Sequence, residues 1–422
     1  MTFIADLQIH SRYALACSKQ TTIPLLEKWA RVKGVDVLGT GDFIHPIWNK
    51  ELKQHLTEDG SGVLQTKNGF KFVLQGEVSN IFHQDGKLRK IHSVILARDF
   101  DVVDQIREHL GKKGKIEADG RPIFGSYSCI ELVEDLMNID KDIEVVPAHV
   151  MTPWFGLFGS KSGFDSVEEC FKDQSKHIHA IETGMSADPP MLWRVSKWNK
   201  YTLLSNSDAH SFWPWRIGRE ATLFDFKELT YSNIIKAIRT REGLEGTIEV
   251  YPSYGKYHWD GHRNCNVSMG PEDTTKNRGL CPACGRPMVI GVENRIEELA
   301  DKPHGYTPEG SKPFKSLIPL SEIISKIKRV EQLYSKTVWT VHEKLMEAFG
   351  SEFNVLLNTS HADLAKVVDP KMAKAIIDLR EGKVEINPGY DGVYGRLIFD
   401  EKDRPEEIIT KQKDKQRILS EF

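Results

Sequence analysis

Seven apolar, β-branched runs in the first 250 residues each end near a side chain that can bind a metal ion. The runs occupy residues 3–10, 35–45, 71–79, 90–97, 143–150, 178–185 and 201–210. Helix patterns, such as the one at residues 21–34, lie between several of them. Parallel strands need crossover helices and are apolar on both faces. The pattern therefore predicts an α/β fold, a closed or nearly closed parallel barrel of seven strands.

Composition narrows the possible function classes. The 422 residues exceed one ordinary core, and 40% of them are hydrophobic, which excludes a disordered chain. With 57 Lys and Arg against 60 Asp and Glu, the net charge is −3, so contact with nucleic acid requires a local basic face. No apolar run approaches the roughly 18 residues of a membrane helix, and the N-terminus lacks a leader pattern. We expect no membrane contact and a cytoplasmic, intracellular location.

Changes in composition and hydrophobic pattern along the sequence predict four parts. Residues 1–250 form the predicted barrel, and residues 251–295 are rich in Gly, Asn, Cys and His but poor in periodic apolar positions. Residues 296–400 have helical patterns, with a long amphipathic segment at 321–349 and two short helices separated at Asp369 and Pro370. Residues 401–422 are dense in charge. We expect a barrel, a small metal module, a helical domain and a tail.

The side chains at the strand ends are all of metal-ligand types. They are Asp6, His10, Asp42, His45, Glu77, His92, His149, Glu182, Asp208 and His210. Imidazole and carboxylate together suit Zn²⁺, Mn²⁺ or Fe²⁺. A single strand-end histidine is more often a capping or core residue, but the carboxyl ends of barrel strands converge on one mouth. The whole set therefore favours a multinuclear metal centre.

Six segments carry a resemblance to a known family: DLQIH, GTGDFIH, GEVS, KIHSV, PAHV and SNSDAH. They resemble the motif series of the PHP-domain metal phosphoesterases. The resemblance implies a distorted seven-stranded β/α barrel that holds up to three divalent ions, Zn, Mg or Mn. It also maps the family's nine ligand positions onto this sequence. These are Gln8, His10, Asp42, His45, Glu77, His92, His149, Asp208 and His210.

The implied chemistry is metal-assisted hydrolysis of a phosphoester, with Asp208, His10, His149 and His210 as catalytic residues. A histidine or aspartate near the mouth would give a proton to the leaving oxygen. One position departs from the family, because Gln8 stands where a histidine is expected. An amide oxygen is a weak neutral ligand, so we expect the ion shared by His10, Glu77 and Asp208 to bind less tightly.

A second set of ligands predicts a structural zinc site. His262 and Cys265 are followed, after fifteen residues, by Cys281 and Cys284. Two such pairs close a tetrahedral zinc site, and the surrounding residues have too few apolar side chains to fold alone. His258 competes for the fourth position, but the spacing favours His262. Reduced cysteines packed in a small hairpin are the alternative.

The C-terminus ends on Gln416, Leu419 and Phe422, which are spaced by three residues. This pattern resembles the peptide with which replication and repair proteins bind the sliding clamp, although a second aromatic residue is missing. An amphipathic tail that packs on its own domain is the alternative.

Two aromatic-rich loops, at residues 152–159 and 211–220, follow predicted metal ligands. Trp154, Phe155, Trp213 and Trp215 are candidates for stacking on an extruded base. Packing at the barrel rim is the alternative role of these side chains.

The order of the parts resembles the endonuclease Q family of DNA repair nucleases over nearly the whole chain. The segments GKYHWDGHRNC, CPACGRPM, GVENRIEELAD and VEINPGYDGVYG follow the barrel. The resemblance implies base flipping and hydrolysis on the 5′ side of uracil, hypoxanthine, xanthine and abasic sites. It also implies binding of damaged duplex DNA by the zinc module and helical domain, a sliding-clamp partner and a nucleoid location. Two alternatives are a small-molecule phosphatase and a DNA-binding protein that Gln8 has impaired.

Overall fold

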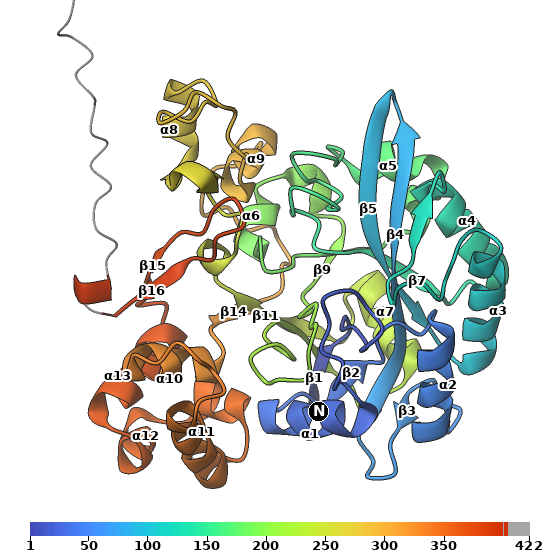
Figure 1. Cartoon of the computed structure of the whole chain (residues 1–422). Coiled ribbons are helices and arrows are strands. Elements are labelled where there is room, and N and C mark those ends of the chain that lie inside the picture. The colour runs from blue at the N-terminus through green and yellow to red at the C-terminus, as the bar shows by residue number, and fades with distance from the viewer. Residues whose placement is uncertain (400, 404–422) are drawn as a thin grey trace, which may run out of the picture.

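The computed structural model describes residues 1–399 and 401–403. A large α/β unit occupies one side of the molecule, and the cysteine-rich module and a helical unit lie on the other (Figure 1). In the described residues, no helix is long and apolar enough to cross a membrane.

A mixed ten-stranded sheet forms the frame of the α/β unit. Its main path runs β14, β11, β10, β1, β2, β4, β5, β7, and β3 and β6 both pair with β4. The strands are β1 (Thr2–Asp6), β2 (Val37–Gly39), β3 (Leu64–Gln65), β4 (Lys71–Gln84), β5 (Lys87–Ala97), β6 (Ile123–Gly125), β7 (Glu144–Pro147), β10 (Ala221–Asp225), β11 (Leu244–Val250) and β14 (Phe314–Leu317). The strands β8 (Ala180–Glu182) and β9 (Thr202–Leu204) pair with each other in a separate parallel sheet.

All seven predicted runs contain a strand, namely β1, β2, β4, β5, β7, β8 and β9. Single backbone contacts link these strands where no ladder of hydrogen bonds joins them. The Val150 amide donates to the Glu182 carbonyl at 3.0 Å, and Ile9 forms a bridge to Ala209. The expectation of an all-parallel barrel is wrong, because β5 runs antiparallel to both β4 and β7. A closed seven-stranded count is not confirmed.

The antiparallel pairing comes from a long hairpin, β4 and β5, that rises above the rest of the unit (Figure 1). Its turn is Asp85 and Gly86, with φ of 52° and 72°. Two left-handed residues in a two-residue turn match the right-handed twist of the strands, and Asp-Gly is the preferred pair. The hairpin brings Glu77 and His92 into adjacent strands.

The α/β unit also contains seven helices, whose apolar faces contribute to the core. They are α1 (Ile23–Lys33), α2 (Pro46–His55), α3 (Phe100–Gly111), α4 (Cys129–Ile139), α5 (Val167–Phe171), α6 (Pro189–Trp193) and α7 (Tyr231–Thr240). In α1, Ile23, Leu26 and Ala30 are buried at spacings of three and four, as predicted. Gly34 ends this helix with φ of 91°.

The cysteine-rich module contains β12 (Asp260–His262), β13 (Val267–Met269), α8 (Pro271–Lys276) and α9 (Val292–Leu299). The predicted boundary at residue 295 falls inside α9. After this helix the chain returns to the main sheet, where β14 pairs in parallel with β11. The segment that contains β14 therefore belongs to the barrel sheet, although it follows the module in the chain. The exact limits of the domains remain a proposal.

The helical unit contains α10 (Leu320–Lys328), α11 (Lys336–Phe349), α12 (His361–Val367) and α13 (Pro370–Arg380). A hairpin of β15 (Glu385–Asn387) and β16 (Arg396–Ile398) follows. The predicted long segment is divided at Arg329, whose φ is 56°. The predicted break before Pro370 is confirmed, because the Asp369 side chain caps α13 by accepting from the Met372 amide.

A buried chain of charged groups joins the helical unit to the barrel. Lys33 Nζ lies 2.8 Å from Glu352 Oε2 and donates to the Pro214 carbonyl at 3.0 Å. The other oxygen, Glu352 Oε1, lies 2.7 Å from His342 Nε2. Lys33 and Glu352 are at most 1% exposed. Four tryptophans, Trp29, Trp213, Trp215 and Trp339, pack together at the same junction.

Replacing Glu352 by Ala is expected to lower the free energy of unfolding by about 3 kcal/mol, because it leaves the Lys33 charge buried without an anion. Urea unfolding followed by tryptophan fluorescence measures this. The exposed Glu347 on α11 provides the matched control, and Glu347→Ala should change stability by less than about 0.5 kcal/mol. A loss below about 1 kcal/mol for Glu352→Ala would show that the pair does not stabilise the junction.

Candidate functional site

Three predicted ligands lie just beyond strand ends in left-handed backbone conformations. Asp42 follows β2 with φ of 43°, His149 follows β7 with φ of 30°, and Asp208 follows β9 with φ of 48°. Such a conformation costs a non-glycine residue about 1–3 kcal/mol and persists only where its surroundings hold it. Strain at three positions around one mouth is typical of a functional site.

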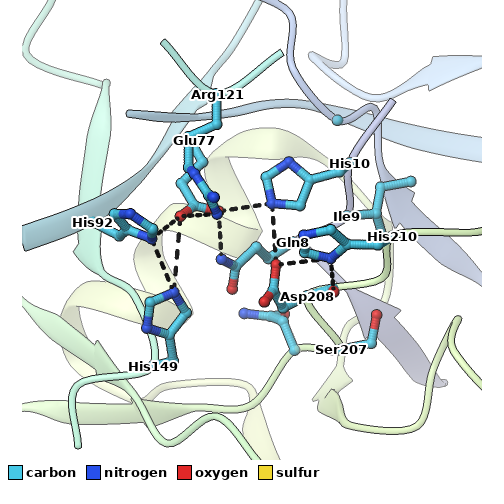
Figure 2. Close-up of polar contacts among 12 residues, drawn as sticks. Gln8, Ile9, His10, Glu77, His92, Arg121, His149, Ser207, Asp208 and His210 are labelled. Carbon is cyan, nitrogen blue, oxygen red and sulfur yellow. Dashed lines mark hydrogen bonds and ion pairs between the residues drawn. The ribbon is translucent and has the colours of Figure 1, made fainter. Parts of the chain in front are cut away.

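One group of ligands is Glu77 on β4, His92 on β5 and His149 after β7 (Figure 2). Glu77 Oε1 lies 2.8 Å from His92 Nδ1 and 3.8 Å from His149 Nε2. The two imidazole nitrogens are 3.2 Å apart. One ligand atom from each residue lies within 4.8 Å of the others, which is close enough for all three to bind one ion.

A second group is His10 after β1 with Asp208 and His210 after β9 (Figure 2). Asp208 Oδ1 lies 3.0 Å from His10 Nε2 and 3.7 Å from His210 Nδ1. His210 Nδ1 also lies 2.8 Å from the carbonyl oxygen of Asp208. Residues from the two ends of the predicted barrel sequence therefore meet, as expected from the convergence of strand ends.

Glu77 links the two groups. Its Oε2 atom lies 3.1 Å from His10 Nε2 and accepts a hydrogen bond from Gln8 Nε2 at 2.8 Å. Burial alone would raise the pKa of Glu77, but the charges of Arg121 and His92 and hydrogen bonds with His10 and His149 together outweigh it and hold the pKa well below its usual value. Glu77 is therefore an ionised carboxylate that both groups share.

Asp42 and His45 lie beside these groups. Asp42 Oδ1 is 2.9 Å from His10 Nδ1, and Asp42 Oδ2 accepts from the Ser11 amide at 2.6 Å. A carboxylate behind a histidine fixes its tautomer and turns the other nitrogen toward a metal. His45 caps α2, where its Nδ1 accepts from the Trp48 amide at 3.4 Å.

A supporting network explains how the strained backbone is held. Glu182 Oε2 accepts from the His149 amide at 2.7 Å, and Glu182 Oε1 accepts from Asn206 Nδ2 at 2.8 Å. Asn206 Oδ1 in turn accepts from the Leu7 amide at 2.8 Å. Glu182 is a strand-end carboxylate in the sequence, yet it positions His149 instead of joining either group. Burial raises the pKa of Glu182 to about 8.

Arg121 is a site residue that the sequence pattern did not reveal. It lies in the loop between α3 and β6, and its Nη1 is 3.4 Å from Glu77 Oε1 (Figure 2). Burial opposes its charge, but Glu77, Asp208 and Asp42 raise the pKa of Arg121 above its ordinary value. No strand or helix pattern marks this position. The turn residues Asp119 and Gly120 before it are the available signal.

Three buried atoms at the centre make no hydrogen bond of good geometry in the described residues. They are Gln8 Oε1 and the two atoms of the close pair, His10 Nε2 and Asp208 Oδ1, which lie 3.0 Å apart. Buried polar atoms without partners are costly, and a cation between them would satisfy all three. The donors are imidazole nitrogens and carboxylate oxygens, which suit divalent transition metals. The site therefore fits divalent ions.

The module brings His262, Cys265, Cys281 and Cys284 together, each with one ligand atom within 4.8 Å of the others. Cys284 Sγ lies 3.4 Å from His262 Nδ1. His258 is outside this cluster and faces Glu293, with its Nε2 3.5 Å from Glu293 Oε2. A His-x-x-Cys pair and a Cys-x-x-Cys pair that meet at one point suit a closed structural zinc site, and the cluster is compatible with such a site.

The four aromatic candidates separate into two kinds. Trp215 is buried and stacks on Trp213 with ring centres 4.8 Å apart, so both pack at the junction with the helical unit. Trp154 is 37% exposed, and the Phe155 ring lies 4.5 Å from that of His92. Phe155 therefore lies beside the ligand His92, and the Trp154 ring lies 5.8 Å from that of Tyr257. Gln416, Leu419 and Phe422 lie outside the described residues.

Comparisons with known proteins agree with the geometry. The family described as the MJ0043 C-terminal domain matches residues 319–383. The uncharacterized protein MJ0043 of Methanocaldococcus jannaschii is 34% identical over 253 residues, which is 59% of this chain but only 31% of that protein. The uncharacterized protein YqxK of Bacillus subtilis is 31% identical over 416 residues, 93% of this chain and 98% of that protein.

Two solved structures extend the match over all parts of the chain. The lesion-specific endonuclease PfuEndoQ from Pyrococcus furiosus is 33% identical with a TM-score of 0.85, over 97% of this chain and 98% of that one. The chain belongs to the endonuclease Q family. Membership identifies it as an enzyme, a metal-dependent nuclease. A second solved structure is a complex of endonuclease Q with a 27-mer duplex substrate that has an abasic lesion at the active site. It is also 33% identical with a TM-score of 0.85, over 97% of this chain and 99% of that one.

Cys281→Ser should reduce the bound metal by one ion per chain and lower the melting temperature, because a hydroxyl is a poor zinc ligand in a site with little apolar core. Elemental analysis and thermal unfolding measure these effects. Cys129→Ala is the control, since Cys129 is buried in the barrel core outside the cluster. A metal content and melting curve equal to those of the unaltered protein would remove the structural metal.

Proposed function

We propose that this chain is a DNA repair endonuclease. It would hydrolyse the phosphodiester on the 5′ side of deaminated bases, namely uracil, hypoxanthine and xanthine, and of abasic sites. The observation that carries the proposal is the convergence of Glu77 and Asp208 with four histidines at one mouth, in a chain of the endonuclease Q family. The complex of a family member with duplex DNA at an abasic lesion supports the substrate class.

Divalent ions, Zn, Mg or Mn and up to three in number, would supply an activated water and neutralise the phosphate. His10, Asp208 and His210 would hold one, and Glu77, His92 and His149 another. The water oxygen would bond to phosphorus and lose one proton to solvent, as the bond to the leaving sugar oxygen breaks. That oxygen takes up a proton from a histidine or aspartic acid at the mouth. Asp208, His10, His149 and His210 are the proposed catalytic residues.

A cavity of about 680 Å³ between the barrel and the helical unit supports DNA as the substrate. Six of its lining side chains are cationic and three are acidic. The cations are Arg216, Arg219, Lys326, Arg329, Arg396 and Lys402. One wall adjoins the metal groups, because Arg219 Nε donates to the carbonyl of Ser207, next to Asp208. Cations along such a surface bind backbone phosphates. Base flipping beside the metals would select damaged bases, which unstack at lower cost.

Gln8 supports one alternative, a DNA-binding protein with an impaired centre. Its amide nitrogen donates to Glu77 where the family position calls for a metal-binding nitrogen. The deciding experiment incubates the protein and Mn²⁺ or Mg²⁺ with duplexes that contain uracil, hypoxanthine or an abasic site, beside an undamaged duplex. Nicking 5′ to the lesion supports the nuclease. Phosphate release from a phosphomonoester without nicking supports a phosphatase. DNA binding without cleavage supports the impaired centre if the substitution Gln8→His restores cleavage.

Asp208→Asn should reduce nicking at least about 100-fold with DNA affinity near that of the unaltered protein, because the carboxylate holds metal and not duplex. Single-turnover cleavage and fluorescence anisotropy measure the two quantities. Asp101→Asn, an exposed residue on α3, is the control for the same chemical change. A large loss of affinity with cleavage of bound DNA intact would contradict the assignment.

The sliding clamp is proposed as a partner through Gln416, Leu419 and Phe422, which would place the enzyme on the nucleoid. Deleting residues 416–422 should abolish binding to the clamp in a pull-down and leave nicking unchanged. Gln416→Ala should act in the same direction, and Gln412→Ala, four residues earlier, should not. Retention of clamp binding in the deletion would contradict this partner.

A further inference from the structure

We infer that Arg121 binds a non-bridging oxygen of the scissile phosphate and is a catalytic residue of the proposed nuclease. The inference rests on the proposed function for the identity of the substrate. It starts from the contacts of the guanidinium in the mouth. The Arg121 side chain is 23% exposed, whereas that of Glu77 beneath it is fully buried. The guanidinium therefore separates the buried carboxylate from the open mouth.

Arg121 uses few of its hydrogen-bond donors on the protein. Within residues 1–399 and 401–403, its side chain makes one hydrogen bond, the 3.4 Å contact from Nη1 to Glu77 Oε1. A guanidinium carries five N–H donors in a planar fork that matches phosphate oxygens two at a time. Glu77 Oε1 is also the oxygen nearest to His92, at 2.8 Å. A cation bound by Glu77 and His92 would compete for that oxygen and leave the guanidinium facing the mouth.

The backbone that carries Arg121 is held rigidly against the site. Asp119 Oδ1 accepts from the Arg121 amide at 2.9 Å and from the Leu15 amide at 3.3 Å. The Gly120 amide donates to the carbonyl of Tyr13 at 3.2 Å. On the other side, the carbonyl of Pro122 accepts from the amide of Ser79 on β4 at 3.0 Å. The loop therefore has fixed contacts on both sides of the arginine.

Gly120 shows how closely the loop approaches the ligands. A Cβ atom at this position would lie 2.3 Å from Asp42 Oδ2, so only glycine fits against the carboxylate that orients His10. A loop needs no such contact merely to connect α3 with β6. A fixed donor aimed where charge develops on phosphate is worth about 10²–10³ in rate when one donor is removed. Arg121 has the position and the rigidity for that role.

The alternative is that Arg121 only neutralises Glu77 and thereby positions it. The two roles predict different inhibition by inorganic phosphate and different activity of the variant Arg121→Lys. The test compares the metal-loaded protein with Arg121→Met, Arg121→Lys and Lys115→Met, the last being an exposed cation in the same loop. The readouts are kcat and KM on a lesion duplex and on bis(4-nitrophenyl) phosphate, the inhibition constant of inorganic phosphate, metal content and melting temperature.

For Arg121→Met we expect kcat to fall about 100-fold or more and inhibition by inorganic phosphate to weaken about tenfold, with metal content unchanged. Arg121→Lys should recover part of both, because it keeps the charge without the fork. Lys115→Met should match the unaltered protein within about twofold. An unchanged inhibition constant in Arg121→Met overturns the inference. A loss of metal that parallels the loss of activity also overturns it, since the arginine would then only position ligands.

The two substrates separate this inference from the proposed function. Hydrolysis of the simple diester without nicking of any lesion duplex sinks the repair function, and the diester kinetics still decide the role of Arg121. Nicking that is equal in the unaltered protein and in Arg121→Met sinks the role of Arg121 alone. Hydrolysis of neither substrate by the unaltered protein overturns both.

Discussion

The arrangement depends on one carboxylate that has no contact with water. Glu77 is fully buried, and an isolated charge in that position would cost several kcal/mol. His10, His92 and Arg121 surround it, and each comes from a different segment of the chain. The need to pair this charge fixes which strand ends and which loop meet at the mouth. A site that is assembled this way is already shaped for cations before any ligand arrives.

The supporting residues show how that shape is kept under strain. Glu182 and Asn206 hold the backbone near His149, and Asp42 sets the tautomer of His10. On the far side, the buried pair of Lys33 and Glu352 anchors the helical unit close to the aromatic loop that follows His210. The helical unit is therefore attached to the loop that follows the candidate ligand His210.

Much of the fold and of the candidate site could be predicted from the sequence. Ligand types at strand ends predicted one multinuclear centre, because strand ends converge, and the structure brings six of these residues together in two groups of three. Paired Cys and His spacing predicted that His262, Cys265, Cys281 and Cys284 meet, and they do. The antiparallel hairpin was missed although Asp85 and Gly86 are a strong turn signal. Arg121 has no periodic neighbours to mark it. Lys33 reads as an ordinary basic residue in the last turn of a helix, because its partner lies 319 residues away. Such long-range pairings have no local pattern.

The position of β14 bears on how the chain is made. Residues 314–317 complete one edge of the barrel sheet, yet they follow the cysteine-rich module in the chain. During translation the barrel must wait with β11 as an open edge until the module has left the ribosome. Exposed edges pair readily with other chains. Early folding of the residues between β11 and β14 would shorten the time for which that edge stands unprotected.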